Sequence, residues 1–300
     1  MTFEHINFTC EFEKAYNKFT EMIENGYTIR QISKIYNQTP YRIIDRLLDK
    51  DNIKNLTAIK EYYDSIKIDD NKCLVISDTH IGRLTSNEDY DTYLKVMRSD
   101  SIFENEAGLY NAYNYAIKNN IKYVIHAGDL IEGESDHSYR ILGPQLQFKY
   151  IDKKYPNVPG IKNYILYGNH DFNLIYYGAY CDDFFKVNDN TEFIGINYSY
   201  VNFLNYPIKV SHYCKASEHY NNIDLPYEFE LSGHSHIFSF DKDRRYIKVP
   251  TLSNINYDTS GKGFLELTNE ENEFVFKFLD INTNLKQEKI LSKKINNSYN

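Results

Sequence analysis

Five short polar clusters in the middle of the chain contain residue types that bind divalent metal ions. In chain order they span residues 77–80, 127–129, 168–171, 211–212 and 233–236. Five of the nine histidines fall in these clusters, each beside another polar residue. Imidazole nitrogen and carboxylate oxygen together bind divalent ions of borderline hardness, and one carboxylate can bridge two ions. The clusters therefore predict a divalent-metal site.

Each cluster follows a short apolar run that we expect to form a β-strand. The expected strands span residues 73–77, 123–126, 164–167, 208–211 and 229–232. In α/β sheets the loops at the carboxyl ends of the strands converge on one crevice. Three of the clusters also contain glycine, which lets the backbone turn sharply beside an ion. We therefore expect the five clusters to meet in space.

The order of these clusters resembles that of the calcineurin-like metallophosphoesterase family. The matching motifs are D-x-H at 78–80, G-D at 128–129, G-N-H-D at 168–171, a single His212 and G-H-x-H at 233–236. The resemblance extends from about Lys72 to Phe240 and includes every family motif in order. It implies an α/β fold, a metallophosphoesterase β-sandwich with a βαβαβ core and flanking helices.

The resemblance also implies two sets of ion ligands that share one bridging carboxylate, Asp129. The implied ligands of the first ion are Asp78, His80 and His236, and those of the second are Asn169, His212 and His234. Manganese is the expected ion, and iron, zinc and nickel also suit this mixed oxygen and nitrogen set.

Two such ions would supply the chemistry of phosphoester hydrolysis. Ions roughly 3.5–4 Å apart can hold a bridging hydroxide and the phosphate oxygens, because their charge lowers the pKa of bound water towards neutrality. The hydroxide would attack phosphorus in line with the leaving oxygen. The resemblance places His170 facing the phosphate, where it would stabilise the transition state or protonate the leaving group. Asp171 would orient His170.

The loop at residues 132–140 follows the second cluster, so it lies next to the expected metal site. Within it, His137 and Arg140 are the candidate substrate-binding residues. Loops are polar in most proteins, so the polar character of these residues does not itself indicate a site. The prediction depends only on the position of the loop beside residues 127–129.

The first 68 residues predict a small helical domain with a connector. Residues 12–25 have apolar side chains at helical spacing. Thr28 and Gln31 form a capping-box pattern at the start of a second helix, and Pro40 occupies the favoured first position of a third. Two short helices joined by a tight turn after a longer helix resemble a helix-turn-helix module.

The third helix of this module would be the recognition helix of a DNA-binding protein. Tyr41, Arg42 and Arg46 would face outward from it and contact DNA. Acidic residues in the first helix reduce the positive charge of the module, and small three-helix units also serve as protein contacts or dimer handles. DNA is therefore the leading expected partner, and another protein or a second copy of the chain is the alternative.

The composition is ordinary for a soluble globular protein. The 300 residues carry a net charge of −8, which argues against coating nucleic acid by bulk charge.

We expect three parts, the helical domain at 1–68, a metallophosphoesterase domain at 69–285 and a polar tail at 286–300. No apolar run approaches the roughly 20 residues that cross a bilayer. No signal peptide or disulfide pattern is visible, so we expect a cytoplasmic protein without a membrane partner.

The motifs do not select the substrate, because one fold serves many specificities. The leading hypothesis is a DNA-directed phosphodiesterase or nuclease, in the manner of the family's double-strand-break repair nucleases, with the helical module holding the active site on a duplex. The first alternative is a phosphatase or phosphodiesterase that acts on small nucleotides. The second is a DNA-binding regulator with a vestigial metal site, which the intact ligand set disfavours.

Overall fold

The computed structural model describes most of the chain. The described residues are 3–48, 51–85, 87–99, 101–133, 140–141, 143–173, 190–213, 225–253, 262–270, 273–281 and 287–290. The candidate substrate residue His137 lies outside them. Four residues of the expected polar tail are described, and they form a strand, so the division into three parts stays a prediction.

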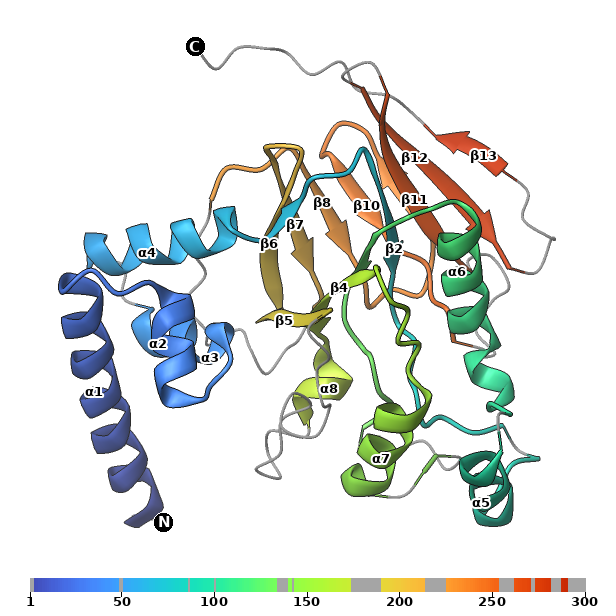
Figure 1. Ribbon diagram of the computed structural model, residues 1–300, viewed down its shortest axis with the longest axis horizontal. Helices are drawn as coiled ribbons and strands as arrows, with labels where there is room; N and C mark the ends of the chain where they lie inside the picture. The colour runs from blue at the N-terminus through green and yellow to red at the C-terminus, as the bar shows by residue number, and fades with distance from the viewer. Residues whose placement is uncertain are drawn as a thin grey trace.

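Two mixed β-sheets pack face to face in the centre of the molecule (Figure 1). Within the described residues one sheet has seven strands, in the spatial order β13 (Gln287–Ile290), β12 (Glu273–Asp280), β11 (Gly263–Glu270), β2 (Lys72–Ile76), β3 (Tyr123–His126), β4 (Lys162–Tyr167) and β5 (Thr191–Ile196). The other has six, in the order β1 (Lys67–Ile68), β6 (Tyr198–Phe203), β7 (Tyr206–Ser211), β8 (Phe229–Ser232), β10 (Tyr246–Lys248) and β9 (Ser239–Asp241).

Strands β2, β3, β4 and β5 run parallel to one another. Parallel neighbours need a crossover connection, usually a helix. The connecting helices are α5 (Tyr90–Arg98), the 3-10 helix η1 (Glu104–Glu106), α6 (Ala107–Lys118), α7 (Pro144–Lys154) and the short α8 (Asn169–Asn173). This arrangement confirms the predicted sandwich with a βαβαβ core.

The alternation of side chains along β2 shows why the sheet has helices on one face and the second sheet on the other. Successive strand residues point to opposite faces. Cys73 and Val75 join the core between the two sheets. Leu74 and Ile76 join a second core beneath α5, α6 and α7. All four are fully buried, as a strand covered on both faces requires.

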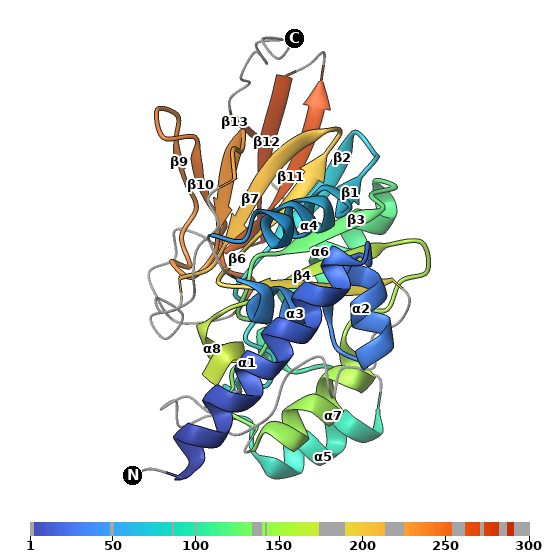
Figure 2. The same cartoon turned by 90° about the vertical axis from the view of Figure 1, so that its left-hand side faces the viewer.

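The N-terminal helices form a bundle at one side of the sheets (Figures 1 and 2). They are α1 (Phe3–Glu24), α2 (Ile29–Tyr36), α3 (Pro40–Leu47) and α4 (Ile53–Asp64). The predicted capping box is present, because the Thr28 side chain accepts from the backbone N–H of Gln31 and the Gln31 side chain accepts from that of Thr28. The bundle shares the core between the sheets and so packs as part of the sandwich.

Helix α3 packs against the seven-stranded sheet, so the outward orientation predicted for Tyr41 is wrong. Tyr41 is 4% exposed, and its hydroxyl donates to that of Tyr167 at 3.2 Å. The helix contacts β5. Residues three and four apart share a helix face, and the face that holds Tyr41, Ile44 and Asp45 lines a cleft against the sheet. Arg42 and Arg46, also expected to contact DNA, are partly buried.

The carboxyl group of Glu106, at the end of η1, is buried at 2% exposure beneath α7. Its Oε2 accepts from the Tyr150 hydroxyl, and its Oε1 has no hydrogen-bond partner among the described residues. Burial raises the pKa of Glu106 from 4.5 to about 8. The folded protein therefore holds a proton here at neutral pH.

This buried proton makes the stability of the protein depend on pH. Between pH 4.5 and 8 the unfolded chain binds fewer protons at Glu106 than the folded chain, so rising pH lowers the free energy of unfolding in this window. The full loss is roughly 5 kcal/mol. In Glu106→Gln, which mimics the protonated acid, urea unfolding measured across this range should give a flatter dependence on pH. An unchanged slope would show that Glu106 is not the group that titrates.

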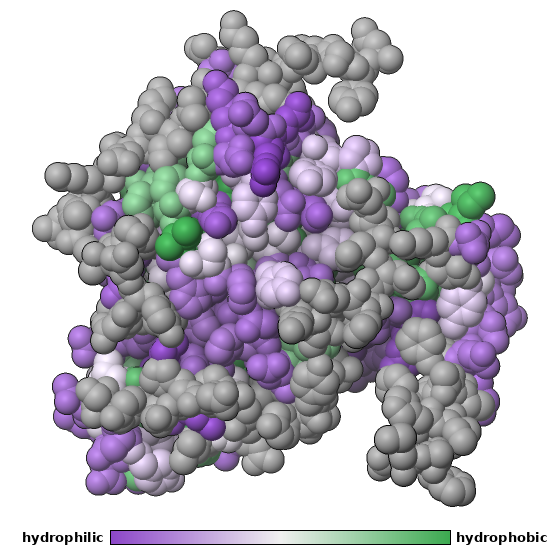
Figure 3. Space-filling model, turned by 180° about the vertical axis from the view of Figure 1, so that it is seen from behind, coloured by the Kyte–Doolittle hydropathy of each residue, from purple (hydrophilic) through white to green (hydrophobic). Residues whose placement is uncertain are grey.

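Within the described residues, no helix combines the length and the apolar character that a membrane span requires. The coloured part of the face in Figure 3 is largely hydrophilic, with hydrophobic residues in small separate patches.

Candidate metal centre

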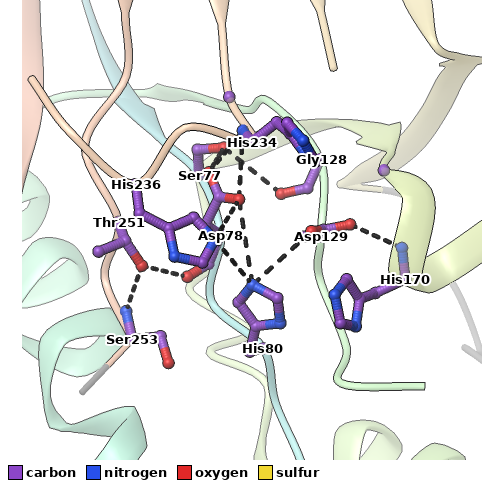
Figure 4. A network of polar contacts seen from close by, with 12 residues as sticks. Ser77, Asp78, His80, Gly128, Asp129, His170, His234, His236, Thr251 and Ser253 are labelled. Atoms are coloured by element: carbon purple, nitrogen blue, oxygen red, sulfur yellow. Dashed lines mark hydrogen bonds and ion pairs between the residues drawn. The ribbon is translucent and has the colours of Figure 1, made fainter. Parts of the chain in front are cut away.

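The five polar clusters converge as the sequence predicts. Asp78 follows β2, Asp129 follows β3 and Asn169 follows β4, so three clusters lie at the same edge of the parallel sheet. His212 follows β7 and His234 follows β8, at the facing edge of the second sheet. Figure 4 shows side chains from both sheets turned towards one another.

The first group of ligand atoms comes from Asp78, His80, Asp129 and His236, whose atoms lie within 4.8 Å of one another. The Nε2 atoms of His80 and His236 are 3.3 Å apart. The Nε2 atom of His236 is 3.1 Å from Oδ1 of Asp78, and that of His80 is 3.6 Å from Oδ2 of Asp129. All the residues implied for the first ion, with the bridging carboxylate, are therefore in one place.

The second group comes from Asp129, His212 and His234, again within 4.8 Å. Oδ1 of Asn169 lies 3.2 Å from Nε2 of His212 and 2.9 Å from Nδ1 of His234. Nε2 of His212 is 3.2 Å from Oδ2 of Asp129. The same carboxylate oxygen, Oδ2 of Asp129, thus faces both groups.

The backbone at these residues is strained in a way that is common at functional sites. Asp78, His80, Asp129, His234 and His236 have φ angles of 51°, 43°, 54°, 74° and 59°. Side-chain-bearing residues rarely adopt this left-handed region, which persists only where the surrounding structure enforces it. Five residues of the expected ligand set share this conformation, so the loops are shaped to direct these side chains inward.

Gly168 allows the loop after β4 to approach Asp129 closely. A Cβ atom at this position would collide with the Oδ1 and backbone nitrogen atoms of Asp129. The backbone here lies against the shared carboxylate, so a larger residue would displace it. The glycine of the third cluster is therefore part of the site's geometry.

The charges of the site also suit cations. Burial raises the pKa of the Asp129 carboxyl. The charge of His212 and the hydrogen bond between His212 and Asp129 outweigh burial and hold this pKa well below its usual range. Burial likewise opposes ionisation of Asp78, and the hydrogen bond from His236 brings its pKa below the ordinary value. Burial lowers the pKa of His212, whereas Asp129 raises it to about 9. Buried carboxylates kept ionised need a positive charge beside them, which divalent ions would supply.

Two histidines are held so that one ring nitrogen faces the site. Nδ1 of His212 is 2.7 Å from the carbonyl oxygen of Ala127. A carbonyl only accepts, so Nδ1 carries a proton, and Nε2 is the nitrogen that would bind an ion once its own proton is released. Nδ1 of His80 is 3.0 Å from Oε2 of Glu132, which fixes that ring in the same way.

The role of Glu132 was missed by the sequence analysis, which placed it only at the start of a loop beside the site. It is 1% exposed and pairs with His80, and Arg83 lies 3.8 Å from the same carboxylate oxygen. Carboxylates that hold ligand histidines in this way are common in metal sites. Its position three residues after Asp129 was the available signal.

His170 is held by a different group from the one predicted. Its Nδ1 is 2.8 Å from the carbonyl oxygen of Glu132, and its backbone N–H donates to Oδ1 of Asp129 at 2.9 Å. The carboxylate of Asp171 accepts from the backbone N–H groups of Leu130, Ile131 and Gly168. Asp171 therefore connects the loop after β3 to the loop after β4. The prediction that it orients the His170 ring is wrong.

Arg140 lies beside this end of the site. It forms an isolated antiparallel bridge with Arg83, whose side chain is near Glu132. Its contact with substrate stays a prediction.

Residues 72–281 match the family described as calcineurin-like phosphoesterase. The match covers more than half of the chain, so the protein belongs to this family. It is a metal-dependent phosphoester hydrolase that binds divalent metal. No curated protein matches the chain.

Several solved structures have a similar arrangement at low sequence identity. The phosphoesterase Yfce from E. coli is 13% identical, with a TM-score of 0.44, covering 75% of this chain and 100% of its own. Vps29 from Entamoeba histolytica, a single mutant, is 10% identical, with a TM-score of 0.36, covering 74% and 99%. The nuclease MPE from Pseudomonas putida is 12% identical, with a TM-score of 0.34, covering 68% and 82%.

Proposed function

We propose that the protein hydrolyses phosphoesters with two divalent ions, most suitably manganese, held by two ligand groups that share Asp129. The position of one carboxylate oxygen supports this most strongly, because Oδ2 of Asp129 lies 3.6 Å from Nε2 of His80 and 3.2 Å from Nε2 of His212. A bridging carboxylate in this position is typical of sites that bind two ions.

When bound, two such ions would supply an activated water and neutralise the charge of the phosphate. His80 and His212 present Nε2 to them, because Nδ1 of each is hydrogen-bonded. His170 keeps its proton on Nδ1 towards the Glu132 carbonyl, so its Nε2 is the atom that can hold a proton for the leaving oxygen. Figure 4 shows this ring beside His80 and Asp129.

The narrower proposal is that the substrate is DNA. One argument for it from the sequence no longer holds. This argument required α3 to present an outward face to DNA, but Tyr41 on that helix is buried against the seven-stranded sheet. This packing favours the second candidate, hydrolysis of small phosphoesters such as nucleotides, with the helices serving as part of the scaffold.

One panel of substrates tests the proposal and separates the two candidates. The purified protein with Mn²⁺ is assayed on linear duplex DNA, single-stranded DNA, a bis-aryl phosphodiester and an aryl phosphomonoester. Turnover of an aryl ester that chelator abolishes and Mn²⁺ restores supports phosphoester hydrolysis. Cleavage of DNA as well assigns the DNA-directed activity, and aryl turnover without DNA cleavage assigns the small-ester activity. No metal-dependent turnover of any of the four would overturn the proposal.

A further inference from the structure

Tyr41 links the N-terminal helices to the strand that leads into the second ligand group. It lies in the first turn of α3 and is 4% exposed. Its hydroxyl donates to that of Tyr167 at 3.2 Å, and the two ring centroids are 5.4 Å apart. Tyr167 is fully buried and is the last residue of β4. Segments 126 residues apart in the sequence are joined here, one residue before Gly168.

Both strand ends beside this contact place a ligand of the second group. Asn169 follows Tyr167 by two residues. On the neighbouring strand, Tyr167 pairs with Ile196. The carbonyl of Asn197, the next residue, accepts from the backbone N–H of His212 at 2.7 Å. Helix α3, which contacts β5, therefore supports the two segments that position Asn169 and His212.

The ligands that belong to the first group alone reach the site from other elements, whereas Asp129 serves both groups. Asp78 and His80 follow β2, and His236 lies in the segment after β8. A disturbance at the contact between Tyr41 and Tyr167 would therefore act on the two groups unequally.

We infer that Tyr41 is a positioning residue for the second ion, acting through its hydrogen bond to Tyr167. This inference rests on the proposed function, because it requires the second ligand group to hold an ion. Tyr41 lies outside both ligand groups of the described residues. It holds the end of β4 in place, and the N-terminal helices thereby become part of the enzyme's metal site.

The direct test is Tyr41→Phe, which keeps the ring and removes the hydroxyl. Mn²⁺ titration followed by calorimetry measures the affinities of the two ions, and EPR distinguishes single from paired manganese. Residues that orient metal ligands typically contribute 10–100-fold to metal affinity. For a residue one step further away we expect one ion to bind about tenfold more weakly and the other to keep its wild-type affinity. Equal weakening of both ions would overturn the inference.

Tyr155→Phe is a matched control at the opposite end of the same strand. The Tyr113 hydroxyl lies 2.9 Å from that of Tyr155 and donates to Oδ1 of Asn163 at 2.7 Å. Asn163 is the second residue of β4. This variant also removes a buried hydroxyl pair, but far from the ligand loops, so both Mn²⁺ affinities should be unchanged. If it weakens the same ion as Tyr41→Phe does, the effect is a general loss of stability and the inference is wrong.

Tyr167→Phe and the double variant provide an independent check. Both substitutions remove the same hydrogen bond. The affinity of the double variant for the second ion should therefore be no lower than that of the single variant with the lower affinity. Losses that add would contradict the role of this bond. Failure of this inference is distinct from failure of the proposed function. A wild-type protein that binds fewer than two Mn²⁺ ions overturns the function, whereas two ions in wild type and unchanged affinities in Tyr41→Phe overturn only the inference.

Discussion

Asp129→Asn should remove both metal ions from the protein at Mn²⁺ concentrations that saturate the wild type. The amide keeps the size of the side chain, and its oxygen can still accept from the backbone N–H of His170, as Oδ1 of Asp129 does at 2.9 Å. It loses the negative charge that faces both groups of ligands. Loss of a shared ligand should exceed the 10–100-fold effect of residues that only orient ligands, so we expect a decrease in affinity of more than about 100-fold. Calorimetric titration with Mn²⁺ measures it.

Asp78→Asn is the matched control, because it makes the same chemical change in a carboxylate that belongs to the first group alone. This variant should lose the first ion and keep the second. If Asp129→Asn instead retains both ions at wild-type affinity, or if the two variants lose the same single ion, Asp129 does not bridge.

His170→Ala should keep both ions and lose most turnover. His170 belongs to neither of the two groups that contain Asp129. A side chain that transfers a proton in the transition state contributes about 10²–10⁴-fold in rate. We therefore expect turnover of an aryl phosphodiester to fall within that range while the manganese content per chain is unchanged. Steady-state kinetics beside elemental analysis of the same sample measures both.

His170→Asn separates proton transfer from loop positioning. Its amide can still donate to the Glu132 carbonyl that now accepts from Nδ1 of His170, but it cannot act as an acid. Turnover should therefore stay as low as in the alanine variant. Recovery of turnover in His170→Asn would assign His170 a purely structural role, and loss of an ion in His170→Ala would make it a ligand.

The sequence predicts the convergence of the five polar clusters because its signals are local. Each ligand cluster directly follows an apolar strand, and the strands expected at 123–126 and 229–232 coincide with β3 and β8. The direction of parallel strands then determines which loops meet, without knowledge of the packing. Strand pattern and ligand type together were sufficient to place Asp78, Asp129 and Asn169 at one sheet edge. His212 and His234 lie on the second sheet, which faces that edge.

The errors concern contacts between distant segments. Glu132 holds the His170 ring across 38 residues of sequence, and nothing in the adjacent Asp171 shows that its carboxylate bonds to backbone N–H groups instead. Tyr41 was assigned to an outward face because helical periodicity shows which residues share a face but not what covers it. Tyrosine suits either environment, since it has an apolar ring and a polar hydroxyl.

The most direct test of the two-ion site is an anomalous difference map from crystals of the protein loaded with Mn²⁺. We expect two manganese peaks, one bounded by Asp78, His80 and His236 and the other by Asn169, His212 and His234, with the Asp129 carboxylate between them. A single peak, or two peaks that do not share Asp129, at full Mn²⁺ occupancy would contradict it.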